Sequence, residues 1–215
     1  MSKKPFSSTC EKNKKPFSSA CEKNKKPILE VLKEIISPEN RHLLEIGAGT
    51  GQHAIYFASH FRDLNWTISD IASRQYDLKQ LIYKEKLKNI HGPIEFEIGK
   101  TLFPREDFDL IFLANVFHII SWKLIKTLIK TFGKSLKEGT QVLVYGPFNY
   151  EGAFTSSGNK QFDKNLREKD PLSGIRSFED VKKVMEKNGL FLGKDYEMPA
   201  NNRLLLFMKI EKVNG

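Results

Sequence analysis

The 215-residue sequence lacks the features that define several large classes of protein. Its two cysteines, Cys10 and Cys21, form neither a C-x-x-C pair nor a metal-binding spacing, so we expect no disulfide framework and no metal site. The longest apolar run, Leu110–Ile120, is too short to span a bilayer and contains two polar residues. The lysine- and serine-rich start does not lead into an apolar stretch of the secretory type. These absences predict a cytoplasmic protein in a reducing compartment with no membrane span.

Acidic residues are also scarce, with 26 Asp and Glu against 35 Lys and Arg, for a net charge of +9. Residues 1–27 carry eight lysines against Glu11 and Glu22 and so account for +6 of that charge. A nucleic-acid-binding surface is normally distributed over the folded body. The concentration of positive charge in residues 1–27 therefore favours a solubilising tail. Weak binding of RNA or anionic lipid by this tail is the alternative.

The basic segment is an 11-residue sequence written twice. Lys3–Asn13 and Lys14–Asn24 differ only in having Thr9 in the first copy and Ala20 in the second. Two copies of this length cannot form the packing units of a solenoid. We expect residues 1–13 to be a mobile duplicated tail and residues 14–215 to form a single domain.

Strand-like and helix-like patterns alternate through the rest of the chain. Expected helices span 28–36, 52–61, 78–87, 122–136 and 178–188, and expected strands span 42–47, 65–70, 93–98, 108–113, 141–148, 190–197 and 204–210. The alternation predicts a Rossmann-like α/β fold with a mostly parallel seven-stranded sheet and helices on both faces. The short connection at 198–202 predicts that the last strand is antiparallel.

A glycine-rich loop joins the first expected strand to the helix that follows it. Gly47, Gly49 and Gly51 are spaced G-x-G-x-G, and Gln52 stands where a dinucleotide-binding loop would have its third glycine. A Walker GK[ST] sequence is also missing, so the loop is not of the phosphate-cradling kind. Glycine at these positions permits tight turns and close approach of a ligand to the backbone.

The segment EIGAGTG resembles the first motif of the class I S-adenosylmethionine-dependent methyltransferases. In that superfamily the loop wraps the methionine and ribose parts of the cofactor, and an acidic residue ends the next strand and accepts the ribose hydroxyls. Asp70 ends the sequence NWTISD, 19 residues after Gly51, and its two carboxylate oxygens can accept two hydroxyl donors. The resemblance implies S-adenosylmethionine as cofactor and S-adenosylhomocysteine as product.

The same resemblance implies further cofactor contacts at the strand ends. The expected set is Glu45, Gly47, Ala48, Gly49, Gly51, Gln52, Asp70, Ile71, Glu97, Asn115 and Val116. Glu97 would accept from the adenine amino group, or is a surface carboxylate. Glu45 would receive the cofactor ammonium, or caps the loop.

The methyl acceptor would lie beyond the fourth strand, at the edge where open α/β sheets bind ligands. His118 is the candidate general base by its chemistry, and a packed histidine is the alternative. Tyr145 and Glu22 are other candidate bases. The Asn/Asp-Pro-Pro-Tyr signature of base and glutamine N-methyltransferases is replaced by ANVF. A small-molecule acceptor is therefore favoured over a nucleic acid.

Several segments together resemble the methyltransferase-like 26 family, among them PFSSACEKNKKPILEVL, LLEIGAGTGQHAIYFA, LVYGPF and MPANN. The similarity runs from about Lys15 to Lys209. It implies that the second copy of the repeat lies across the cofactor site, with Ser18, Cys21, Glu22 and Asn24 facing the substrate or serving as a helix cap.

Residues 149–176 contain too few apolar side chains for a strand or a core helix, and long loops of this kind are usually functional or disordered. We expect a lid with a short helix over the substrate, from which Asn159 and Arg167 reach the acceptor. In the alternative, Arg167 pairs with Asp163 or Asp170 on the surface.

The sequence thus predicts a methyltransferase that transfers a methyl group to a small molecule by in-line displacement. A catalytically silent methyltransferase fold that binds the cofactor or a partner protein is the main alternative. A protein tethered to RNA or membrane through its basic tail is the third hypothesis.

Overall fold

The computed structural model describes residues 17–210. Its α-helices are α1 (Ser19–Ile35), α2 (Gln52–Ala58), α3 (Gln75–Glu85), α4 (Trp122–Ser135), α5 (Ser157–Lys169) and α6 (Phe178–Lys187), with 3₁₀ turns at Ala72–Arg74 and Pro199–Asn201. Its strands are β1 (His42–Ile46), β2 (Asn65–Asp70), β3 (Ile90–Glu95), β4 (Leu110–Ala114), β5 (Gln141–Asn149), β6 (Arg176–Ser177), β7 (Leu190–Met198) and β8 (Asn202–Lys209).

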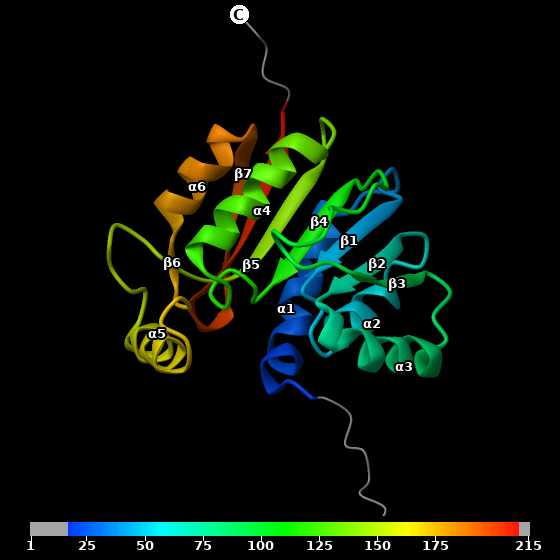
Figure 1. Cartoon of the computed structure of the whole chain (residues 1–215), viewed down its shortest axis with the longest axis horizontal. Coiled ribbons are helices and arrows are strands. Elements are labelled where there is room, and N and C mark those ends of the chain that lie inside the picture. The colour runs from blue at the N-terminus through cyan, green and yellow to red at the C-terminus, as the bar shows by residue number, and fades with distance from the viewer. Residues whose placement is uncertain (1–16, 211–215) are drawn as a thin grey trace, which may run out of the picture.

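The strands form one twisted sheet in the order β3-β2-β1-β4-β5-β8-β7, and the short β6 pairs with β5 (Figure 1). Strands β1 to β5 are parallel to one another, whereas β8 is antiparallel to both β5 and β7. The predicted mostly parallel sheet with an antiparallel last strand is confirmed. The strand order reverses at β1, between β2 and β4, and ligands of open α/β sheets bind at the carboxyl ends of such strands.

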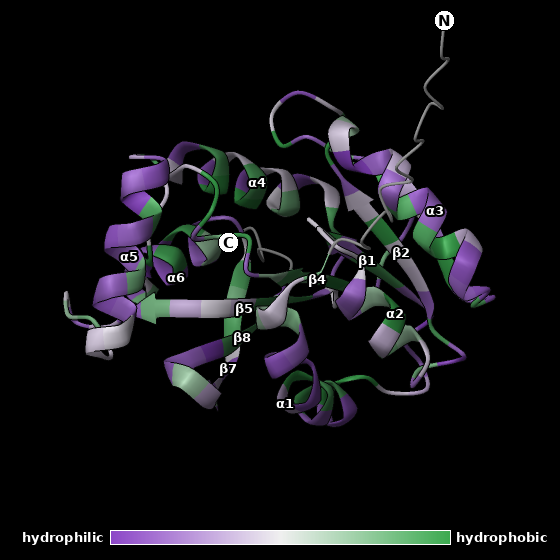
Figure 2. Ribbon diagram, turned by 90° about the horizontal axis from the view of Figure 1, so that it is seen from below, coloured by the Kyte–Doolittle hydropathy of each residue, from purple (hydrophilic) through white to green (hydrophobic). Residues whose placement is uncertain are grey.

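Helices cover both faces of the sheet, and each face has its own core. Helices α1, α2 and α3 pack on one face around Phe57 and Trp66, and α4 and α6 pack on the other around Phe132 (Figure 1). The sequence explains α4 directly. Ser121 caps its first turn, and the apolar residues at 125, 128, 129 and 132 form one buried stripe. In Figure 2, α5 lies at one end of the molecule beyond β5, and α3 lies at the opposite end.

The predicted third strand, 93–98, is wrong by three residues at each end. Strand β3 begins at Ile90, contains Pro93 and ends at Glu95, so Glu97 lies in the turn after it. Strand β3 pairs only with β2, and an edge strand tolerates a proline, which cannot donate a hydrogen bond. The apolar alternation that predicts this strand begins at Pro93, so it leaves out residues 90–92.

The first helix also differs from its predicted range. It begins at Ser19 and runs through Pro27, whereas the apolar periodicity predicts a start at Ile28. Ser18 caps the helix by accepting a hydrogen bond from the Cys21 backbone N–H at 3.3 Å, as the alternative for Ser18 predicts. The first repeat copy and Cys10 lie outside the described residues.

The insertion between β5 and α6 contains a 13-residue helix, α5, in place of the short helix that we predicted. Ser156 caps it, and Asn159, Asp163 and Leu166 form its buried face. Within residues 17–210, none of the helices is both long and apolar enough to cross a membrane.

Candidate active site

The glycine loop connects the carboxyl end of β1 to α2 at the point where the strand order reverses. Gly47, Gly49 and Gly51 all have positive φ, between +58° and +74°. The backbone N–H groups of Gly47 and Ala48 donate to the Ser69 carbonyl oxygen at 2.9 and 3.1 Å, which ties the loop to the end of β2. These two backbone bonds fix the start of the loop against β2.

The first two glycines have different spatial roles. A Cβ on Gly47 would lie 2.8 Å from Cγ2 of Val116, so the residue must be glycine for the β1 and β4 loops to meet. A Cβ on Gly49 would meet no atom closer than the Gly47 oxygen at 3.9 Å. The space beside Gly49 is open. A cavity of about 810 Å³ reaches Gly49, Thr50 and Gln52 and extends between α1, α2 and α3.

Asp70 ends β2 directly beside this loop. Its Oδ2 accepts the Gly49 N–H at 2.7 Å and its Oδ1 accepts the Ile71 N–H at 2.8 Å. An ionised carboxylate has about four lone-pair sites, so each oxygen can accept another donor. Asp70 is thus fixed in orientation by the backbone while still able to accept two hydroxyl groups.

Glu45 lies at the start of the loop motif and is buried against Trp66. The Trp66 indole N–H donates to Oε2 of Glu45 at 2.7 Å. Burial, with a smaller contribution from the negative charge of Asp70, raises the pKa of the Glu45 carboxyl to about 8, although the indole bond opposes the shift. Glu45 therefore carries a proton at neutral pH.

Glu97 follows Phe96, whose backbone N–H donates to the Asp70 carbonyl oxygen at 3.0 Å. The Glu97 carboxylate forms an ion pair with Lys100 at 2.7 Å on the surface of the turn. Ile71 is exposed beside Asp70. The structure thus brings Ile71 and Glu97 to the same edge as Asp70.

His118 lies in the loop after β4 and is only 5% exposed. Its Nδ1 and the Asn115 Oδ1 lie 3.5 and 4.0 Å from the position that a Cβ on Gly146 would take, and its ring meets that of Phe162 edge-on at 5.3 Å. Burial, and to a lesser extent the charge of Arg176, lowers the pKa of His118 to about 4. His118 is therefore a neutral imidazole at pH 7.

Tyr145 lies in the middle of β5 and is also buried. Burial raises the pKa of its phenol to about 12, opposed by hydrogen bonds with the side chains of Asn24 and Asn202. Cys21 is close enough to contribute to this shift, and burial raises the pKa of its own thiol. Two of the three predicted substrate residues in α1, Cys21 and Asn24, therefore gather at Tyr145.

The third, Glu22, lies apart from this group. It forms an ion pair with Lys25 and lines the cavity between α1, α2 and α3. Its side chain is about half exposed.

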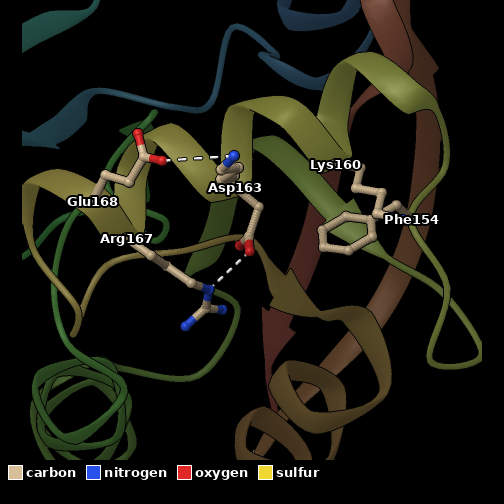
Figure 3. A pocket seen from close by; sticks show the side chains of 6 residues that line it. Phe154, Lys160, Asp163, Arg167 and Glu168 are labelled. Carbon is tan, nitrogen blue, oxygen red and sulfur yellow. Dashed lines mark hydrogen bonds and ion pairs between the residues drawn. The ribbon is translucent and has the colours of Figure 1, made fainter.

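The two predicted residues of α5 have partners within the protein. Asn159 is buried and donates from Nδ2 to Thr155 Oγ1 at 2.8 Å and to the Asn201 carbonyl oxygen at 3.1 Å. Arg167 donates from Nε to Asp163 Oδ2 at 2.7 Å, as the alternative for this residue predicts. Figure 3 shows this ion pair in a shallow groove of about 460 Å³ that α5 forms with Phe154.

Three positions that the sequence analysis missed shape the site. His53 binds Asn24, and Gly146 leaves room between His118 and Asn115. Arg176 donates to the carbonyl oxygens of Phe117, Ile120 and Leu172, and so joins the β4–α4 loop to the segment before α6. Gln52 and His53 directly follow the glycine loop, and this position in the sequence marks His53 as a candidate site residue. No local sequence pattern marks Arg176.

The residues that the structure describes include no group of three or more His, Cys, Asp or Glu side chains placed to hold a metal ion.

Comparison with known proteins identifies a family and a fold. The DUF938 family, described as a protein of unknown function, matches residues 15–209. A release factor glutamine methyltransferase of Dictyoglomus turgidum (strain DSM 6724 / Z-1310) is 32% identical over 100 residues, which cover 44% of this chain and 34% of that protein.

Several solved structures, methyltransferases among them, have the same fold. PigF with SAH superposes with a TM-score of 0.76 at 14% identity, covering 87% of this chain and 56% of that one. Human N-acetylserotonin methyltransferase in complex with SAM gives 0.73 at 18% identity, covering 89% and 53%. The mitomycin 7-O-methyltransferase MmcR gives 0.74 at 15% identity, covering 86% and 54%. The chain thus spans about half the length of these structures and a third of the glutamine methyltransferase.

These relatives confirm the predicted superfamily resemblance, while the similarity to the methyltransferase-like 26 family stays a prediction. The chain belongs to the DUF938 family and has the fold of the class I S-adenosylmethionine-dependent methyltransferases.

Proposed function

We propose that the protein is an S-adenosylmethionine-dependent methyltransferase that acts on a small-molecule acceptor. The observation that carries the proposal is Asp70, whose two oxygens are each held by a single backbone N–H while retaining free lone pairs. This arrangement fits the two hydroxyls of a ribose. The open space beside Gly49 fits a ligand that approaches the backbone closely.

In this proposal Asp70 orients the ribose, and Gly47, Ala48, Gly49, Gly51 and Gln52 surround the methionine part. Ile71 and Glu97 flank the adenine, with Asn115 and Val116 on the opposite side. Glu45 faces the ammonium group and would release its proton when that charge arrives, because a nearby cation favours the ionised carboxylate.

The cofactor supplies a methyl group on a sulfonium that is already an activated leaving group. The protein then has chiefly to align the acceptor atom with the methyl carbon and to exclude water. His118 and Tyr145 face the acceptor side, and both are neutral at pH 7. His118 is retained as the candidate base, with an imidazole lone pair free to accept a proton. Cys21 and Asn24 would contact the acceptor, and α5, with Asn159 and Arg167, would form the lid of the insertion at 149–176.

A small-molecule acceptor agrees with several relatives of the same fold, including an O-methyltransferase solved in complex with apigenin. The proposal places the protein in the cytoplasm, with residues 14–215 as one catalytic domain.

A second function is favoured by one specific observation. Neither His118 nor Tyr145 has a pKa near neutrality, since that of His118 is lowered to about 4 and that of Tyr145 is raised to about 12. A protein that binds the cofactor without turnover would show this arrangement. Transfer of radiolabelled methyl groups into a cell metabolite extract, lost in His118→Ala, would exclude this silent alternative.

The proposed function is tested by thermal unfolding in the presence of S-adenosylmethionine, S-adenosylhomocysteine, NAD or ATP. A ligand at 100 times its dissociation constant stabilises the folded state by about 2.7 kcal/mol. We expect stabilisation by the two S-adenosyl compounds only. Stabilisation by NAD, with none by either S-adenosyl compound, would refute the proposal.

A further inference from the structure

The first half of α1 is held in place by polar contacts. The buried residues of this helix, Ile28, Leu29, Leu32 and Ile35, all lie in its second half. Pro27 has no backbone N–H, so the helix also lacks the one i→i−4 bond that would reach the Lys23 carbonyl oxygen. With no buried apolar residue of its own, this half is positioned by polar contacts with the rest of the protein.

These bonds come from the start of α2. The Ser18 backbone N–H donates to Oε1 of Gln52 at 2.6 Å, and Nε2 of His53 lies 2.7 Å from Oδ1 of Asn24. Gln52 and His53 directly follow the glycine loop. The same short segment thus contacts the loop on one side and the first half of α1 on the other.

In the hydrogen bond between His53 and Asn24, the amide oxygen of Asn24 faces Nε2 of His53. His53 is 4% exposed and its ring is stacked on Phe57 at 5.3 Å. Burial, and secondarily the charge of Lys25, lowers the pKa of His53 to about 4, so the ring is neutral and has a single N–H. An amide oxygen can only accept, so His53 must donate from Nε2.

This direction also sets the orientation of the Asn24 amide. Its oxygen faces His53, so its NH₂ group is the end left for its hydrogen bond with the Tyr145 phenol. The Asn202 side chain also forms a hydrogen bond with the phenol, and its Nδ2 donates to the Pro199 carbonyl oxygen at 3.2 Å. His53 thus determines which end of the Asn24 amide meets the Tyr145 oxygen.

We propose that His53 is a positioning residue for the acceptor side of the site: it holds the Asn24 amide with its NH₂ group toward Tyr145, and so fixes the phenol that meets the acceptor. The proposal rests on the proposed function, because it assigns Tyr145 to acceptor binding. Without His53 the amide is free to turn its oxygen toward Tyr145, and the first half of α1 loses one of its bonds to α2.

Three variants test the proposal in a Cys10→Ser chain, in which Cys21 is the single thiol. His53→Leu removes the donor, His53→Gln keeps an N–H at the same reach, and Asn24→Ala removes the acceptor at a half-buried position. His60→Leu, at an exposed histidine seven residues after His53, is the matched control. The ¹³Cζ-tyrosine resonance of Tyr145, assigned with Tyr145→Phe, reports the phenol environment, and iodoacetamide reports the exposure of Cys21.

We expect His53→Leu and Asn24→Ala to shift the Tyr145 resonance and to speed Cys21 alkylation by about three- to tenfold, the effect of losing one hydrogen bond. His53→Gln and His60→Leu should resemble the parent chain. An unchanged Tyr145 resonance in both His53→Leu and Asn24→Ala would overturn the proposal, as would a failure of His53→Gln to restore it. Calorimetry with S-adenosylhomocysteine separates the two hypotheses: absence of binding by the parent chain would refute the proposed function and leave the Tyr145 result standing.

Discussion

The two sides of the candidate site are built in different ways. On the glycine-loop side, backbone groups between Gly47 and Ile71 make most of the contacts, and two of their N–H groups fix the Asp70 carboxylate. On the Tyr145 side, side chains come from four separate segments, including Asn24, His118 and Asn202. A backbone-built half tolerates few sequences, whereas a side-chain-built half can change residue by residue. Under the proposed function, the backbone-built side binds the cofactor and the side-chain-built side binds the acceptor.

The largest effect is expected where the backbone-built side leaves no room. Gly47→Ala places a Cβ 2.8 Å from Val116 at φ +74°, and should destabilise the protein by about 2–4 kcal/mol from the clash and the left-handed conformation. Gly152 has the same φ but no atom within 4 Å of its would-be Cβ. Gly152→Ala should therefore cost only about 1–2 kcal/mol in urea unfolding.

A second substitution tests the cause of that difference. Val116→Ala removes the atom that the new Cβ would meet, so the double variant should recover part of the loss of Gly47→Ala. Equal losses for Gly47→Ala and Gly152→Ala would contradict a steric role for Gly47.

Glu45 provides a pH-dependent test on the same side. Its pKa is about 8 in the folded protein against an ordinary 4.5, so the folded chain keeps a proton that the unfolded chain releases above pH 4.5. Its contribution to stability is full below pH 4.5 and is lost as the pH rises toward 8. Relative to Glu45→Gln, the free energy of unfolding of the parent chain should fall by about 2 kcal/mol between pH 5.5 and 7.5. Parallel pH profiles for the two chains would show that Glu45 is ionised when folded.

The smallest expected losses of folding stability distinguish two arginines on the side-chain-built half. Arg176 donates to three backbone carbonyl oxygens, and Arg176→Ala should cost about 1–2 kcal/mol of folding stability. Arg167 forms one half-exposed ion pair with Asp163, and Arg167→Ala should cost about 0.5 kcal/mol or less. Chemical denaturation of both variants makes the comparison. A larger loss for Arg167→Ala would show that the α5 ion pair, and not Arg176, fixes the insertion.

The sequence predicted the backbone-built side well because its signals are local. Glycine spacing and a buried strand lie within a few residues of each other, and Asp70 follows at the end of the next strand. The antiparallel β8 also followed, since the short final connection leaves no room for a crossover.

The parts of the fold and of the site that the sequence did not predict depend on contacts between distant segments. Residues 19–26 contain no buried apolar residue, so the periodicity could not show that α1 begins at Ser19. The bond between Asn24 and His53 spans 29 residues, and the bonds of Arg176 reach the β4–α4 loop from nearly 60 residues away. The placement of Pro93 inside β3 depended on β3 being an edge strand, which a local pattern does not reveal.

Titration calorimetry with S-adenosylhomocysteine tests the central claim most directly, using the parent chain, Asp70→Ala and Asp180→Ala as an exposed acidic control in the first turn of α6. The two hydroxyl bonds to a carboxylate should be worth about 3 kcal/mol together, so Asp70→Ala should weaken binding about 100-fold and Asp180→Ala should not. Binding of equal strength by the parent chain and Asp70→Ala would contradict the account, as would no binding by the parent chain.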